Sequence, residues 1–109
     1  MATTYKVLGQ SAPSATSDTD VYTVPSATEA VISTITVANR AATAATYRIA
    51  IRPDGATIAN QHYIAYGASV PANDTIALTL GITLDAADVV TVYASSADLS
   101  FGIFGSEIA

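Results

Sequence analysis

Short segments of the chain alternate between apolar and polar residues with a period of two. In DTIALTLGITL at 74–84, an isoleucine or leucine occupies every second position, and Ala, Thr or Gly fills the positions between them. Side chains of a β-strand point alternately to its two faces, so this pattern predicts one strand with a single buried face. The segment ATYRIAIRP at 45–53 alternates in the same way and places Arg48 and Arg52 together on the outer face.

Other segments rich in Val, Ile, Thr and Tyr predict further strands, and together they make about eight. The additional segments are TYKVLG (4–9), DVYTV (20–24), TEAVISTITVAN (28–39), HYIAY (62–66), VVTVYAS (89–95) and LSFGIFGSEI (99–108). Each of the four prolines is expected in a connection, because proline cannot donate to a strand ladder. Helical periodicity is almost absent between these segments.

This spacing predicts an all-β fold in one domain spanning residues 1–109. One-sided sheets must cover each other's apolar faces, which favours an antiparallel β-sandwich of jelly-roll or immunoglobulin-like type. A small β-barrel is the alternative. Residues 10–19 are small and polar and are expected to form a loop. Residues 1–20 are therefore a candidate N-terminal arm or bridging segment, whose first strand could pair with a neighbouring subunit.

Half of the residues are apolar and only 12% are charged, so little charge is available to solvate a free surface. Much of the apolar content is alanine, which leaves two interpretations open. The surface is either a solvated Ala and Thr surface or one buried against other subunits. The second interpretation predicts a homo-oligomer.

Charge, cysteine content and the first residues of the chain argue against nucleic-acid partners, disulfides and a secretion signal. Nine carboxylates against four Lys and Arg residues give a formal net charge of -5, which disfavours binding to nucleic acid. The absence of cysteine excludes disulfides and thiolate metal ligation. The opening MATTYKVLGQ lacks the pattern of a signal peptide, and no apolar run approaches the roughly 20 residues of a membrane helix. We therefore expect a soluble protein made in the cytosol, without membrane partners.

No residue pattern indicates catalysis, a cofactor or a metal site. His62 is the only histidine, and we expect its side chain to point outward at the start of a strand. The aspartates fall mainly in predicted turns, where their side chains cap the backbone. No serine stands in a GxSxG elbow, and only one histidine could serve as its base. Tryptophan, common in sugar-cleaving clefts, is absent. The chain is accordingly predicted not to be an enzyme, and a small hydrolase is the least supported alternative.

Five side chains are candidates for surface or interface contacts. Tyr66 lies three positions after Tyr63, so the two rings are expected on opposite faces of their strand. In FGIFGSEI, Phe104 is expected on the face opposite Phe101, and the two glycines are expected to allow a bulge or a close backbone approach. The candidate contacts are Arg48, Arg52, His62, Tyr66 and Phe104.

The order of these strands and turns resembles small virion proteins of tailed bacteriophages, especially those of aquatic and cyanobacterial hosts. The segments that carry the resemblance are VYTVP (21–25), STITVANR (33–40), TYRIAIRPDGA (46–56), HYIAY, PANDTIALTLGITL (71–84), DVVTVYAS (88–95) and LSFGIFGSEI. They span nearly the whole chain, although they are a strand framework and not a catalytic signature.

The resemblance implies a β-sandwich displayed on a virion and synthesised in the cytoplasm of the host. The implied function is capsid decoration, or cementing, in which contacts between subunits stabilise the particle. Major capsid or tail proteins are the implied partners, and a decoration protein is expected to form a homo-oligomer, typically a trimer. The alternative is a module of the tail, neck or fibres that binds a host receptor or glycan through outward-facing side chains.

Overall fold

The computed structural model describes residues 2–109 and contains nine β-strands. Two short 3-10 turns, η1 (Pro53–Gly55) and η2 (Asn60–His62), lie between the fourth and fifth strands. The strands are β1 (Thr3–Ser11), β2 (Thr19–Thr23), β3 (Glu29–Asn39), β4 (Ala45–Arg52), β5 (Tyr63–Val70), β6 (Thr75–Leu78), β7 (Ile82–Leu84), β8 (Val89–Ala94) and β9 (Leu99–Ile108). All four prolines lie outside the strands, as predicted.

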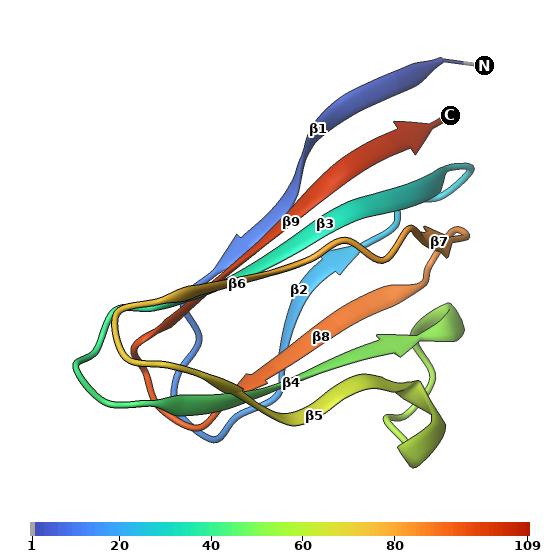
Figure 1. The fold of residues 1–109 in the computed structure, drawn as a ribbon. Coiled ribbons are helices and arrows are strands. Elements are labelled where there is room, and N and C mark those ends of the chain that lie inside the picture. The colour runs from blue at the N-terminus through green and yellow to red at the C-terminus, as the bar shows by residue number, and fades with distance from the viewer. Residues whose placement is uncertain (1) are drawn as a thin grey trace.

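The strands form two antiparallel sheets that pack face to face as a sandwich (Figure 1). Sheet A has the order β1-β9-β3-β6, with β7 also paired to β3, and sheet B has the order β2-β8-β4-β5. The pairs are nested: β4 with β5, β3 with β6 and β7, β2 with β8, and β1 with β9. A chain that doubles back on itself and is then wound into two sheets is a jelly roll. The predicted all-β sandwich is confirmed, and its jelly-roll form is the one adopted; the sheets do not close into a barrel.

The core lies between the two sheets and follows the predicted alternation. On β4, Tyr47 and Ile49 point into the core, while Arg48 and Arg52 lie on the outer face, as the sequence predicted. Other large side chains at the centre are fully buried: Ile32, Ile35, Val37, Val90, Val92, Leu99 and Ile103. Burial of such aliphatic side chains contributes about 1.5 to 3 kcal/mol each and is the main favourable contribution to folding.

The segment at 74–84 differs from its prediction as a single strand. β6 and β7 both pair with β3, but Thr79–Gly81 separates them, and the φ angle of Gly81 is +63°. Leu80, expected on the buried face, is 53% exposed because the chain leaves the sheet at this point. The two-residue period was correct within each half of the segment, and the break explains why nine strands form and not eight.

Strand β1 pairs with β9 of its own chain over most of its length. This pairing places the two ends of the chain next to each other, and Ala2 and Ala109 exchange both of their backbone hydrogen bonds (Figure 1). The predicted loop after β1 leads from sheet A to sheet B, so this segment bridges the two sheets within one chain. One side of β1 is therefore paired within its own chain and not, as the sequence had suggested, with a neighbouring subunit. The other side of β1 is an edge of sheet A.

The described residues include no helix of the length and apolar character needed to cross a membrane.

Candidate functional site

A row of aromatic and cationic side chains crosses the outer face of sheet B. Tyr93 of β8, Arg48 of β4 and Tyr66 of β5 are direct neighbours in the strand register. The Arg48 guanidinium carbon lies 4.0 Å from the centre of the Tyr93 ring and 4.2 Å from that of Tyr66. A guanidinium between two aromatic faces is attracted by both ring quadrupoles, so the row is held together within the face.

Tyr63 joins this row against the prediction from strand alternation. Its ring meets the Tyr66 ring edge to face, with centroids 4.9 Å apart, so both rings lie on the same face. The reason is a register shift in the β4–β5 ladder, where Ile49 pairs with Ala65 and Ala50 with Tyr63, leaving Ile64 without a direct partner. A bulged residue of this kind changes the phase of the side chains that follow it. We call Arg48, Tyr63, Tyr66 and Tyr93 the tyrosine–arginine cluster.

The tyrosine–arginine cluster borders a shallow cavity. Asn60, Tyr63 and Tyr66 line about 260 Å³ at this edge of sheet B. Tyr66 is 63% exposed, so most of its ring is free to contact another molecule. Aromatic side chains that present a large surface next to amide and guanidinium donors are common in binding surfaces. The cluster is therefore the candidate contact surface of sheet B.

Arg52 lies on the predicted face, but its guanidinium is engaged by its own chain. It donates to Asp20 Oδ1 (3.0 Å), to Thr91 Oγ1 (3.0 Å) and to the carbonyls of Gly55 and Ala56 (3.2 and 3.0 Å). Thr91 in turn donates to the same Asp20 oxygen at 2.8 Å. Arg52 is thus a structural residue that links β4 to β8 and β2 across sheet B and holds the turn after β4. The neighbouring hollow of about 310 Å³ is lined in part by this network.

His62 is buried, which corrects the expectation of an outward-pointing side chain. It is the last residue of η2 and only 8% exposed. Its Nδ1 accepts the backbone N–H of Ala59 at 3.0 Å. The imidazole therefore stabilises the turn before β5, and the position expected to be an exposed strand start is the end of a 3-10 turn.

Apolar side chains gather on the outer face of sheet A. Phe104 lies there, opposite Phe101 and Ile103, as predicted, and its ring packs over Gly102. The register of β1, β9 and β3 brings further apolar side chains to this face. We call the set the apolar strip; its members are Tyr5, Val7, Val31, Phe104 and Ile108.

Two members of the apolar strip belong to the edge strand and are well exposed. Tyr5 is 84% exposed and Val7 is 49% exposed. Sequence reasoning did not single out either residue, although both belong to the segment TYKVLG that was predicted to form a strand. Alternation showed that they share a face, but the strand order was needed to show that this face is an outer one at an edge.

The inner side of the same sheet end carries a small polar network. Glu107 of β9 accepts a hydrogen bond from the Tyr22 hydroxyl at 2.6 Å and forms an ion pair with Lys6 at 2.8 Å. Hydrogen bonds from Lys6 and from Tyr22 hold the pKa of the Glu107 carboxyl below its ordinary value. Burial, together with the hydrogen bond and charge of Glu107, raises the pKa of the Tyr22 phenol. The network links β1 and β9 of sheet A to β2 of sheet B.

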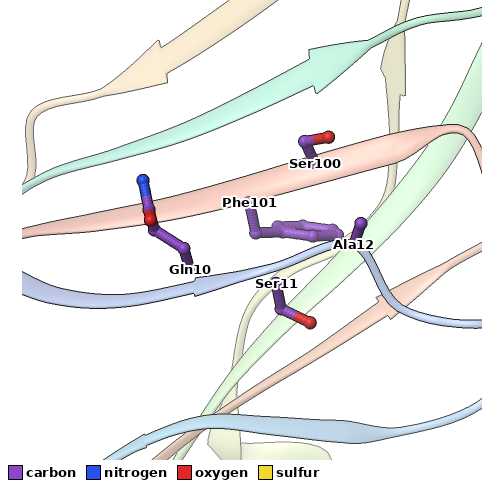
Figure 2. A pocket seen from close by; sticks show the side chains of 5 residues that line it. All are labelled: Gln10, Ser11, Ala12, Ser100 and Phe101. Carbon is purple, nitrogen blue, oxygen red and sulfur yellow. The ribbon is translucent and has the colours of Figure 1, made fainter.

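A third shallow cavity of about 370 Å³ lies where β1 ends beside β9. Figure 2 shows the Phe101 ring next to Ala12, with the Gln10 and Ser11 side chains pointing in opposite directions. Its lining contains no charged side chain and no pair of nucleophile and base. Within residues 2–109, no group of three or more His, Cys, Asp or Glu side chains is placed to hold a metal ion.

Comparison of the chain with protein-family models, with curated proteins and with solved structures finds no match in any of the three.

Proposed function

We propose that this chain is a non-enzymatic structural subunit of a tailed-phage particle, which decorates the capsid and stabilises it by adding contacts between neighbouring subunits. The carrying observation is the apolar strip, where Tyr5 and Val7 leave apolar area exposed on a face with few charges. The jelly roll supports the proposal by analogy, because this architecture recurs in viral capsid proteins. A subunit that binds the assembled shell and not its dissociated parts stabilises the shell by mass action.

The strip is suited to a flat contact with a shell. It extends across β1, β9 and β3, so a partner surface would touch three adjacent strands and not a flexible loop. A rigid strand framework loses little conformational freedom on binding, which favours stable attachment. Val31 is the best position for a test because it is half-buried on this face, while its neighbours Ala30 and Ile32 point into the core.

The test is a heat challenge of particles that lack the gene for this protein. We expect such particles to release DNA at a lower temperature than complete ones, and purified protein added back to restore the difference. Val31→Asp should fold, as judged by circular dichroism, but fail to restore heat resistance, because a carboxylate would be buried in the contact. Ser69→Asp, on the exposed face of β5, is the matched control and should restore it fully. Unchanged heat resistance of particles without the protein would reject the proposal.

The tyrosine–arginine cluster favours a second function, the binding of a host receptor or glycan by a tail or fibre module. The specific observation is the cavity lined by Asn60, Tyr63 and Tyr66, where an exposed ring lies beside an amide. A sugar ring can stack on an aromatic face while its hydroxyls reach the amide. Saturable binding to host cells or a glycan array, lost in Tyr66→Ala and retained in Val31→Asp, would favour this function over decoration.

A further inference from the structure

We propose that β1 pairs, edge to edge and antiparallel, with β1 of a second copy of this chain, with Tyr5 at the two-fold axis. The inference deepens the proposed assembly function and rests on it for its biological purpose, but it depends physically on the hydrogen-bonding pattern of one strand. The site is the free side of sheet A along Thr3–Val7.

The direction of the backbone groups along β1 follows from its pairing with β9. Ala2 and Ala109 exchange both backbone hydrogen bonds, and the register then runs without a shift from Thr3 to Val7. Hydrogen-bonded pairs alternate in an antiparallel ladder. Thr4 and Lys6 therefore direct their N–H and C=O groups toward β9. The backbone groups of Thr3, Tyr5 and Val7, which alternate with them, point away from β9 toward the free edge.

The other sheet edges are shorter or less regular than β1, whose own protective features are the inward-directed Lys6 and the irregularity after Val7. β5 has two register irregularities, and β2 has only five residues with an irregularity of its own. β6 and β7 are short and are separated by a break. Short strands and bulges are the usual protection of edges against pairing. Along Thr3–Val7 the ladder is regular and all five residues are exposed, so this edge is a template for another strand.

A second copy is the strand that fits this edge best. Antiparallel pairing of identical strands centred on Tyr5 matches Thr3 of one copy with Val7 of the other, so all three outward-directed residues of each copy are used. The pairing would form about six backbone hydrogen bonds. The irregularity between Val7 and Gly9 ends the regular edge, which sets the length of the contact. On the outer face, the pairing brings Tyr5 and Val7 of both copies together and joins the two apolar strips.

In this register each charged side chain on the inner face of β1 is already neutralised by its own chain. Lys6 is the only charged residue of Thr3–Val7, and it would lie opposite Thr4 of the second copy. Thr4 pairs with Glu107 on its other side, so the second copy's Glu107 would lie about 10 Å away along the same row, two strand spacings from Lys6. Each Lys6 ammonium keeps its own Glu107 carboxylate at 2.8 Å, and the two Lys6 residues lie diagonally across the axis, about 7 to 8 Å apart. The pairing brings no like charges into direct opposition.

Single-cysteine cross-linking tests the register directly, because the chain contains no cysteine of its own. At a two-fold axis through a hydrogen-bonded pair the Cα atoms are about 5.5 Å apart, a separation that a disulfide can span. We expect Tyr5→Cys to form a disulfide-linked dimer under mild oxidation. Thr3→Cys alone should not, but Thr3→Cys mixed with Val7→Cys should form a heterodimer. Failure of Tyr5→Cys to cross-link, or equal cross-linking of Thr3→Cys alone, would overturn the proposal.

A proline variant tests the role of the backbone. The Tyr5 N–H points away from β9, so Tyr5→Pro removes no hydrogen bond within the chain and should fold. Sedimentation velocity from micromolar to high micromolar concentration should show a concentration-dependent dimer for the wild type. Tyr5→Pro should raise the dissociation constant of the dimer about tenfold or more. Tyr66→Ala, on the outer face of sheet B, is the control and should dimerise as the wild type does. A monomeric wild type that still restores heat resistance would reject the pairing alone; a dimer that fails to protect particles would reject the decoration function alone.

Discussion

The outer faces of the two sheets differ in how their large side chains are covered. On sheet B, Arg48 lies between two tyrosine rings and Arg52 is held by Asp20 and two loop carbonyls. On sheet A, Tyr5 and Val7 at the β1 edge have no comparable cover from their own chain. The difference shows that exposure alone does not define a contact surface. Sheet B engages both of its arginines within the chain although Tyr66 stays exposed, whereas sheet A leaves apolar side chains exposed on a regular edge strand.

The largest expected effect concerns the close packing in sheet A. A Cβ added at Gly105 would meet the carbonyl oxygen of Val31 on the neighbouring central strand, and backbone cannot move aside cheaply. We expect Gly105→Ala to lower the free energy of unfolding by about 3 kcal/mol, measured by urea denaturation. Gly67→Ala in sheet B meets no atom within 4 Å but has a φ of +69°, so it should cost only about 1 kcal/mol. Equal losses would show that packing at Gly105 is not the constraint.

Replacing Arg52 should cost more unfolding free energy than replacing Arg48. Arg52→Met removes four hydrogen bonds that fasten the loop after β4 and should lower the free energy of unfolding by about 2 to 3 kcal/mol. Arg48→Met removes two ring contacts and keeps a long apolar side chain, so about 1 kcal/mol is expected. Thermal and urea unfolding of both variants measure the difference. A larger loss for Arg48 would reverse the assignment of Arg52 as the structural residue.

Acid should weaken the polar network of sheet A. The folded-state pKa of Glu107 lies below its unfolded value, so its carboxylate adds stability above the ordinary carboxyl range, and that contribution is lost as the pH falls through the folded-state pKa. Between about pH 6 and about pH 3, the wild type should therefore lose more unfolding free energy than Glu107→Gln. Urea titrations at each pH measure the two curves. Parallel curves would show that Lys6 and Tyr22 do not stabilise the charged form.

The smallest effect is expected at the exposed edge of sheet A. Val7→Thr keeps the β-branched shape and should change the free energy of unfolding by no more than about 0.5 kcal/mol at a protein concentration low enough to keep the chain monomeric. Urea denaturation at that concentration is the measurement. A loss clearly above 1 kcal/mol would mean that Val7 packs within the monomer, and the contrast between the two outer faces would then be weaker.

Strand alternation predicted much of the fold because it is a local property of the backbone. It placed Tyr47 and Ile49 inside and both arginines outside, and it identified strands in every segment where the structure has them. It failed where the ladder is irregular. The bulge at Ile64 reversed the expected face of Tyr63 relative to Tyr66, and the break at Gly81 exposed Leu80.

The candidate contacts were less predictable than the strands. Arg48, Tyr66 and Phe104 lie on outer faces, as predicted. Arg52, however, is engaged by Asp20, which is distant along the chain, and His62 is buried in the turn before β5. Whether a polar side chain is free depends on which strands lie beside it, and composition carries no information on that. The edge residues Tyr5 and Val7 were missed for the same reason.

The sequence by itself determined that this chain is an all-β protein with one buried face on most strands, because side-chain direction in a strand depends only on the two-residue repeat. Only the tertiary structure decided between the jelly-roll and immunoglobulin-like forms, because both contain the same kinds of strand and differ in which strands pair. The tertiary structure also decided that β1 is an edge strand, because that depends on β1 having a neighbour on one side only. The proposed contact between two copies depends on that long-range choice.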